Sequence, residues 1–409
     1  MPLILSLICS TLFFLAVGDQ PTSQPTSQST SQPTTAPSPL TPAPQQEPYF
    51  KLLQVDRAWE ITRGSPDCLV GVIDTGFDFF HPALYGRLEP GYFADGVYHT
   101  DFVTMDSHGT AVTSIIIAHN VAPDGMVGFA PACRAIGACS GMPEHALARM
   151  QQEFFDEHPD ATIQDWQMQM VQRAGDLQTF GQTWIDYITR TTAEAIRYLV
   201  DHNARVINIS AFLPEHLLGR YPDFARRLDD AFDYAIEKDV VMVIGAGNTA
   251  TLVSGYPGDK DTVLVVGACL LDGQRWETTV ERRGMSIKQG SCLGPRLSVM
   301  APMDQLLIAR LHEKGFYDVE DTPMGRQDAE YDGQYDVTPF GATSMATPIV
   351  TSLAALVRSL RPDLSAREVI DLIKKGAVDM GEPGFDELTG HGRIDFLKTL
   401  ELARAHPAK

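Results

Sequence analysis

Four short apolar segments, each bounded by turn-forming residues, constrain the fold of this chain more than any other feature. They cover residues 69–73, 205–209, 240–244 and 263–266. Each is rich in β-branched residues and about five residues long, which is typical of strands buried on both faces of a parallel sheet. The sequence therefore predicts a central sheet made mainly of parallel strands.

Helical patterns alternate with these segments. Apolar residues recur at helical spacing within 185–199, 224–236 and 369–373. The last pattern follows Ser365-Ala-Arg-Glu368, a capping box in which both side chains bind free backbone N–H groups. Strand–helix alternation on this scale predicts the α/β class, with helices on both faces of the sheet. We therefore expect a three-layer α/β/α domain with a mainly parallel central sheet.

The amino-terminal 48 residues have a different composition from the rest of the chain. Residues 3–17 are almost all apolar, but this run is shorter than the roughly 20 residues that a membrane-spanning helix needs. We interpret residues 1–18 as a secretory signal peptide, with an uncleaved anchor as the alternative. Residues 19–48 consist almost entirely of Pro, Ser, Thr and Gln and offer little to bury. We expect a disordered linker there and a folded domain at 49–409.

Charge and cysteine content narrow the classes of partner and scaffold. The formal net charge of −20 repels phosphate, which argues against binding to nucleic acid or to an anionic membrane. Six cysteines in 409 residues do not make a disulfide scaffold. Removal of Cys9 with the signal peptide leaves five, so at most two bridges can form within one chain. The sequence does not select the pairing.

Three short segments carry candidate catalytic residues. Asp74 ends the first predicted strand, and ligand sites in parallel sheets form at the carboxyl ends of strands. His108 precedes Gly109 at the start of an apolar helical stretch, where it could act as a general base. Ser344 begins a long apolar helix, whose positive end stabilises negative charge on a substrate oxygen. These positions predict a site built from strand and helix ends.

Taken alone, each of these residues has a simpler structural interpretation. Asp74 could cap the following turn, His108 could be a surface or capping residue, and Ser344 could be a helix N-cap. Asp-Thr-Gly also occurs in aspartic proteases, but these need two carboxylates that share a proton. No second Asp-Thr-Gly or Asp-Ser-Gly occurs in the sequence. The functional interpretation therefore depends on the combination and order of the three segments.

In the order Asp74, His108, Ser344, the three segments resemble the subtilisin-like serine proteases, the subtilase family. Segments between and after them also resemble this family, in its order. They are 128–131, 206–210, 245–248 and 390–395. The resemblance extends from about residue 59 to residue 400 and implies a subtilisin-like fold with serine endopeptidase activity.

The resemblance also implies a role for each site residue. Ser344 attacks the scissile carbonyl, His108 takes its proton, and Asp74 orients the imidazole. Asn248 donates to the tetrahedral oxyanion together with the backbone N–H of Ser344. The triad would form an acyl-enzyme intermediate and needs neither a cofactor nor a catalytic metal.

Three further residues are expected to bind substrate, namely Ser210, Ala211 and Phe212. The resemblance implies that these residues form a strand that pairs with an extended peptide. The family usually has a small-residue turn containing glycine after the serine. Phe212 stands there in this chain, which predicts a narrowed primary pocket.

Two other positions depart from the family pattern. Ala342 replaces the usual glycine before Thr343-Ser344, and it would be strained if its φ were positive. Ala111 stands where the family usually has a second histidine.

An insertion with helical patterns is expected at about 140–183. It could be a lid or exosite beside the cleft, or a surface addition without function.

We expect a secreted serine endopeptidase that acts on proteins or peptides. Members of the family often bind calcium, but no calcium-binding loop of recognisable spacing occurs in the sequence, so we assign no metal site. We expect no nucleic-acid partner and no membrane insertion after signal cleavage, and the oligomeric state stays open. One alternative is a catalytically silent peptide-binding relative. The departures from the family pattern at Ala342 and Phe212 favour this alternative. The other is a hydrolase of different acyl substrates that uses the same triad.

Overall fold

The computed structural model describes most of the chain from residue 40 to residue 407. Within this range it leaves out 80, 95–106, 120–124, 141–153, 156, 163, 167, 170–176, 211–212, 215–219, 253–254, 257–259, 261, 283–284, 310–334 and 339–340. The predicted signal peptide and most of the predicted linker therefore lie outside the described residues.

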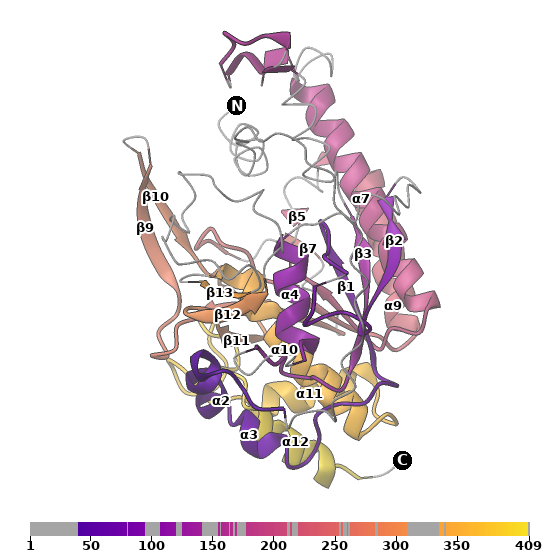
Figure 1. The fold of residues 1–409 in the computed structure, drawn as a ribbon, viewed down its shortest axis with the longest axis vertical. Coiled ribbons are helices and arrows are strands. Elements are labelled where there is room, and N and C mark those ends of the chain that lie inside the picture. The colour runs from indigo at the N-terminus through magenta and orange to yellow at the C-terminus, as the bar shows by residue number, and fades with distance from the viewer. Residues whose placement is uncertain are drawn as a thin grey trace, which may run out of the picture.

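A seven-stranded sheet forms the centre of the domain (Figure 1). Its spatial order is β11-β8-β6-β4-β1-β3-β2, and all neighbouring strands are parallel. The strands are β1 (Leu69–Asp74), β2 (Leu88–Phe93), β3 (Arg134–Cys139), β4 (Val206–Ile209), β6 (Val241–Gly245), β8 (Val263–Cys269) and β11 (Val299–Pro302). The four predicted strands are confirmed as β1, β4, β6 and β8.

Helices cover both faces of this sheet, which confirms the predicted three-layer α/β/α architecture. α7 (Leu177–Asp201) and α9 (Pro222–Glu237) pack on one face. α4 (Ser107–Ile117) and α10 (Ala342–Leu360) pack on the other, where α10 contacts β4, β6, β8 and β11. The two faces bury separate apolar clusters, because alternate residues of each strand point to opposite sides. Burial on both faces explains why the strands have continuous apolar sequences.

Smaller elements surround the three layers. Three two-stranded sheets pair β9 (Glu277–Arg282) with β10 (Met285–Gly290), β12 (Leu306–Ala309) with β13 (Tyr335–Thr338), and β5 (Leu213–Pro214) with β7 (Gly255–Tyr256). Further helices in the described part of the chain include α3 (Val55–Ala58), α11 (Ala366–Gly376) and α12 (Phe396–Ala405). The predicted capping box begins α11: the Glu368 backbone N–H donates to Ser365 Oγ, and the Ser365 N–H donates to Glu368 Oε2.

The folded part begins before residue 49, which corrects the predicted end of the linker. The 3-10 helix η1 (Pro44–Gln46) and helix α2 (Glu47–Leu52) pack on the domain. Gln46 is buried, donates from Nε2 to the Val127 carbonyl at 2.7 Å, and accepts from the Val127 N–H at 2.9 Å. Tyr49 and Phe50 are also buried. The Pro-rich composition did not reveal this contact because Val127 is distant in sequence.

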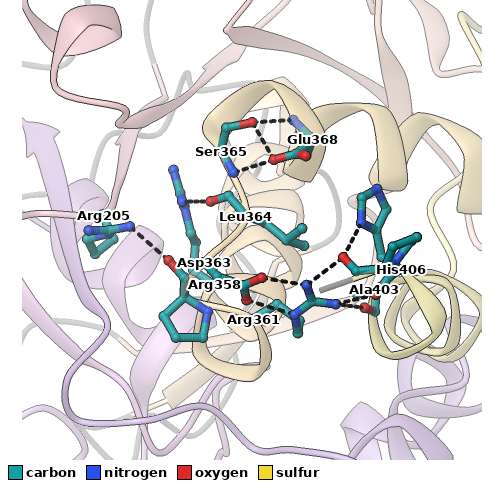
Figure 2. Close-up of polar contacts among 11 residues, drawn as sticks. Arg205, Arg358, Arg361, Asp363, Leu364, Ser365, Glu368, Ala403 and His406 are labelled. Carbon is teal, nitrogen blue, oxygen red and sulfur yellow. Dashed lines mark hydrogen bonds and ion pairs between the residues drawn. The ribbon is translucent and has the colours of Figure 1, made fainter. Parts of the chain in front are cut away.

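The carboxyl-terminal helix is held by a cluster of polar contacts around α10, α11 and α12 (Figure 2). Arg361 forms two hydrogen bonds to the Asp363 carboxylate and also donates to the carbonyls of Ala403 and His406. Arg358 is buried and donates to the Leu364 carbonyl. Arg361 thus satisfies carbonyls at the carboxyl end of α12, which otherwise lack intrahelical partners.

The predicted insertion at 140–183 lies mostly outside the described residues. Helix α7 starts at Leu177, so its first turns come from the carboxyl end of this segment. Trp166, a described residue within it, is buried. The choice between a lid, an exosite and a surface addition therefore stays a prediction. None of the helices in the described part of the chain is long and apolar enough to cross a membrane.

Candidate active site

Asp74 is the last residue of the central strand β1. Its side chain is 4% exposed, and its Oδ1 accepts hydrogen bonds from the Thr75 N–H at 2.8 Å and from Thr75 Oγ1 at 3.3 Å. His108 Nδ1 lies 2.8 Å from the same oxygen. The local turn thus fixes the carboxylate, and the open side of Oδ1 faces the imidazole.

His108 lies in the first turn of α4 and faces the end of β1. Because the Asp74 carboxylate accepts hydrogen bonds when ionised, the short contact assigns the imidazole proton to Nδ1. Nε2 then carries the lone pair of a general base. The His108 side chain is 33% exposed, whereas the Asp74 side chain behind it is buried.

Gly109 allows α4 to approach the end of β1 this closely. A Cβ atom built at Gly109 would lie 2.0 Å from the Gly76 carbonyl oxygen and 3.1 Å from Asp74 Cβ. Any side chain here would push the start of α4 away from the turn. The glycine therefore sets the distance between His108 and Asp74.

Ser344 lies in the first turn of α10. Its hydroxyl donates to the Ser210 carbonyl at 3.1 Å, and the Ser210 hydroxyl donates to the Ser344 carbonyl at 2.9 Å. This reciprocal pair joins the start of α10 to the end of β4. Among the described residues, the hydrogen bond of the Ser344 hydroxyl goes to Ser210 and not to His108.

Ala342, the first residue of α10, has a φ of 52°. This lies in the left-handed region that favours glycine, so the condition for strain at this position is met. The turn before Ser344 thus keeps its left-handed geometry although the sequence supplies a residue with a Cβ.

Asn248 follows β6 and is fixed by Thr343. Its Oδ1 accepts from the Thr343 backbone N–H at 3.0 Å and from Thr343 Oγ1 at 2.7 Å. Because the backbone N–H can only donate, the amide oxygen must face Thr343. The Asn248 Nδ2 group is therefore directed away from Thr343, and Asn248 itself is exposed. The amide has two donor hydrogens for a substrate oxygen.

A buried polar chain supports the contact between Ser344 and Ser210. Asn208 is fully buried in β4, donates from Nδ2 to Ser210 Oγ at 3.0 Å and accepts from Thr351 Oγ1 at 2.8 Å. Neither the contacts of Asn208 nor those of Thr343 were predicted from the sequence. A polar residue inside an otherwise apolar strand was the available signal, since buried polar groups need partners.

The remaining predicted substrate residues are only partly described. Ser210 is 5% exposed and lies at the junction of β4 and α10. Ala211 and Phe212 lie outside the described residues, so the narrowed pocket stays a prediction. In the described part of the chain, no group of three or more His, Cys, Asp and Glu side chains could hold a metal ion.

Comparisons with known proteins identify the family of the chain. The sequence model of the Subtilase family matches residues 65–392. A thermophilic serine proteinase of Bacillus sp. (strain AK1) is 28% identical over 77% of this chain and 58% of its own length. Mycosin-4 of Mycobacterium tuberculosis is 30% identical over 85% of this chain and 67% of its own length.

A likeness to solved structures extends over most of the chain. The crystal structure of MycP1 from Mycobacterium smegmatis has a TM-score of 0.62 and 24% identity, and the match covers 92% of this chain and 90% of that one. At this identity the likeness shows the fold. The chain spans less than two thirds of the length of the Bacillus proteinase, so that protein's activity is carried over only as a proposal.

Proposed function

The chain belongs to the subtilase family, and we propose that it is a serine endopeptidase with Ser344, His108 and Asp74 as its catalytic triad. The observation that carries the proposal is the 2.8 Å contact between His108 Nδ1 and the buried Asp74 carboxylate. A surface or capping histidine has no need of a buried carboxylate behind it. A general base needs one, because the carboxylate stabilises the imidazolium that forms.

Proton transfer requires the Ser344 hydroxyl to change its hydrogen-bond partner. The Ser344 hydroxyl would leave the Ser210 carbonyl and donate to His108 Nε2, which takes the proton as Ser344 Oγ attacks the scissile carbonyl. His108 then gives this proton to the leaving amine, and water hydrolyses the acyl-enzyme in a second step. A hydrogen bond to Ser210 of 3.1 Å is weak enough to be exchanged in this way.

The tetrahedral oxyanion would be bound by Asn248 Nδ2 and the Ser344 backbone N–H. The Thr343 contacts support this assignment because they occupy Asn248 Oδ1 and leave Nδ2 free to donate. The Ser344 N–H belongs to the first turn of α10, where backbone donors lack intrahelical acceptors. In subtilisin itself, loss of the corresponding asparagine lowers kcat by about 100- to 1000-fold, a known magnitude that we adopt for Asn248.

Substrate binding is proposed at the end of β4, where Ser210, Ala211 and Phe212 would pair with an extended peptide. Ser210 supports this placement because it joins β4 to the nucleophile. A bulky Phe212 would reduce the primary pocket and favour small side chains at the scissile residue. A cleavage profile with a strong preference for bulky aromatic residues there would contradict this part of the proposal.

Export is proposed from the amino-terminal composition. Residues 1–18 would serve as the signal peptide, and the Pro/Ser/Thr/Gln-rich segment that follows would be the linker. A relative of the chain is the halolysin-like extracellular serine protease Nep of Natrialba magadii. Amino-terminal sequencing of protein from the culture medium tests this: a mature chain that begins near residue 19 supports it, and an intact residue 1 contradicts it.

The activity is tested with fluorescein-labelled casein and, in parallel, a small ester substrate. We expect the wild type to cleave casein and the Ser344→Ala variant to lose at least 1000-fold in kcat. Ser352→Ala, further along the same helix, is the matched control and should retain activity. Casein cleavage by Ser344→Ala would refute the assignment. Hydrolysis of the ester alone would favour the alternative of a different acyl hydrolase, and folded wild type inactive on both substrates would favour the silent peptide-binding relative.

A further inference from the structure

Two cysteines stand side by side at the start of neighbouring strands. Cys68 directly precedes β1 and Cys133 directly precedes β3. The parallel register pairs Leu69 with Arg134, so the two cysteines occupy the preceding position on each strand. Neighbouring strands lie about 4.7–4.9 Å apart. This spacing falls within the Cα separation of about 4.4–6.8 Å that a disulfide requires.

Both cysteine side chains point to the same face of the sheet. Cys68 shares an apolar cluster with Val70 of β1, and Cys133 shares the same cluster with Ala135 of β3. Because side chains of a strand alternate between faces, positions 68 and 70 share one face, as do 133 and 135. Both cysteines are free thiols in the structure.

The space around the two sulfurs is closed. Cys68 is 3% exposed and Cys133 is fully buried. A Cβ built at Gly64 would lie 2.6 Å from Cys133 Sγ, and Ser359 Oγ lies 3.6 Å from the same sulfur. An additional ligand would have to displace these neighbours, whereas a bond between the two sulfurs adds no heavy atom. The environment therefore favours a covalent pair over a metal or ligand site.

The chemistry of the two thiols is unequal. The neighbouring Cys68 thiol lowers the pKa of the Cys133 thiol, and Ser359 and the Arg87 guanidinium lower it further, against the effect of burial. The neighbouring Cys133 and burial raise the pKa of the Cys68 thiol. Cys133 is thus the thiol that ionises first, and the thiolate is the reactive form.

We propose that Cys68 and Cys133 form a disulfide bond when the chain matures in an oxidising compartment. The oxidant is a disulfide, such as oxidised glutathione or an oxidoreductase disulfide. The exchange takes place during folding, before the space around the two sulfurs is closed. The thiolate of one cysteine attacks one oxidant sulfur and displaces the first thiolate. The thiolate of the other cysteine then attacks the cysteine sulfur of this mixed disulfide and displaces the second. The cysteine pair loses two electrons and two protons, and the oxidant is reduced to two thiols.

The other described cysteines stand next to residues of other types. Cys139 stands opposite Asp74 in β1, and Cys269 stands opposite Pro302 in β11. Cys292 lies against Thr249, with the two side chains 3.2 Å apart. The Cys68–Cys133 bond would close a loop of about 65 residues that contains both Asp74 and His108, and it would restrict the unfolded chain.

The test is a disulfide map of the full chain, refolded with oxidised and reduced glutathione and then alkylated without reduction. We expect trypsin to release residues 64–87 joined to residues 88–134, separable only by a reductant. We also expect the reductant to lower the unfolding temperature of the wild type by about 5–10 °C. Recovery of Cys68 and Cys133 in alkylated form, or linked to other cysteines, would overturn the proposal.

Variants distinguish this bond from other effects of the reductant. The double variant Cys68→Ala/Cys133→Ala should lose the response of its unfolding temperature to reductant, and the matched control Cys269→Ala should keep both the response and the cross-linked peptide. The map is equally informative in the Ser344→Ala background, which prevents self-digestion. Its outcome is therefore independent of whether the chain is a peptidase.

Discussion

Ala342→Gly is expected to stabilise the protein, although glycine at the start of a helix usually has the opposite effect. Ala342 has a φ of 52° in the turn before Ser344. An L-residue in this left-handed region costs about 1–2 kcal/mol, because its Cβ approaches the following carbonyl oxygen. Glycine lacks that Cβ and adopts the conformation without strain.

Two losses offset this gain. Glycine costs roughly 0.5–1 kcal/mol in additional backbone entropy. The methyl group of Ala342 is partly buried against the core, and half of a buried methyl contributes about 0.4 kcal/mol. The net stabilisation is then about 0.5 kcal/mol.

The matched control is Ala354→Gly in the middle of the same helix. Ala354 is fully buried, and its φ is not positive. Its replacement should cost about 1 kcal/mol in helix propensity and about 0.8 kcal/mol in lost burial. The two substitutions are chemically identical, so their difference of about 2 kcal/mol reports the backbone conformation.

The assay is urea unfolding followed by tryptophan fluorescence, with every variant in the Ser344→Ala background to prevent self-digestion. We expect a higher midpoint for Ala342→Gly and a lower midpoint for Ala354→Gly, with the slope unchanged. Equal destabilisation by both substitutions would show that the turn before Ser344 is not strained.

Three further perturbations test the site and its surroundings. Gly109→Ala should lower kcat at least tenfold, because its Cβ would collide with the Gly76 carbonyl and move α4; wild-type kcat in a folded variant would contradict the close approach. Thr343→Val should lower kcat about tenfold with KM unchanged, since it removes one donor that orients Asn248; an effect on KM alone would contradict this role. Burial and, to a smaller extent, a nearby guanidinium lower the pKa of His119, so the folding stability should fall as the pH drops below 6.5. His119→Gln should reduce this loss of stability, measured by urea unfolding at pH 7 and at pH 5. An unchanged difference between the two pH values would assign the loss to other groups.

The central strands could be predicted from sequence because strands buried on both faces of a sheet have continuous apolar sequences. Leu69–Asp74 and Val263–Cys269 are continuous apolar segments, and both form strands of the sheet. The edge strand β2 was not predicted, because it contains Glu89-Pro90-Gly91 and is only half buried. A Cβ at Gly91 would lie 2.6 Å from the Gly137 carbonyl oxygen, so the neighbouring strand β3 leaves no room for a side chain at this position.

Contacts between distant segments explain what the sequence did not reveal about the site. The positions of Asp74, His108 and Ser344 follow from short motifs in a characteristic order. The orientation of Asn248 depends on Thr343, which reaches it only when the start of α10 meets the end of β6. The conformation of Ala342 also depends on this junction. From the sequence alone, strain at Ala342 could be predicted only on the condition that its φ is positive.

The central claim is that Ser344 is a nucleophile activated by His108. Reaction with a fluorophosphonate probe tests it most directly, because the probe forms a covalent bond with an activated serine. We predict that intact protein mass spectrometry shows a single adduct, that peptide mapping places it on Ser344, and that Ser344→Ala and His108→Ala abolish it. Folded wild type that fails to react, or an adduct on a different residue, would contradict the claim.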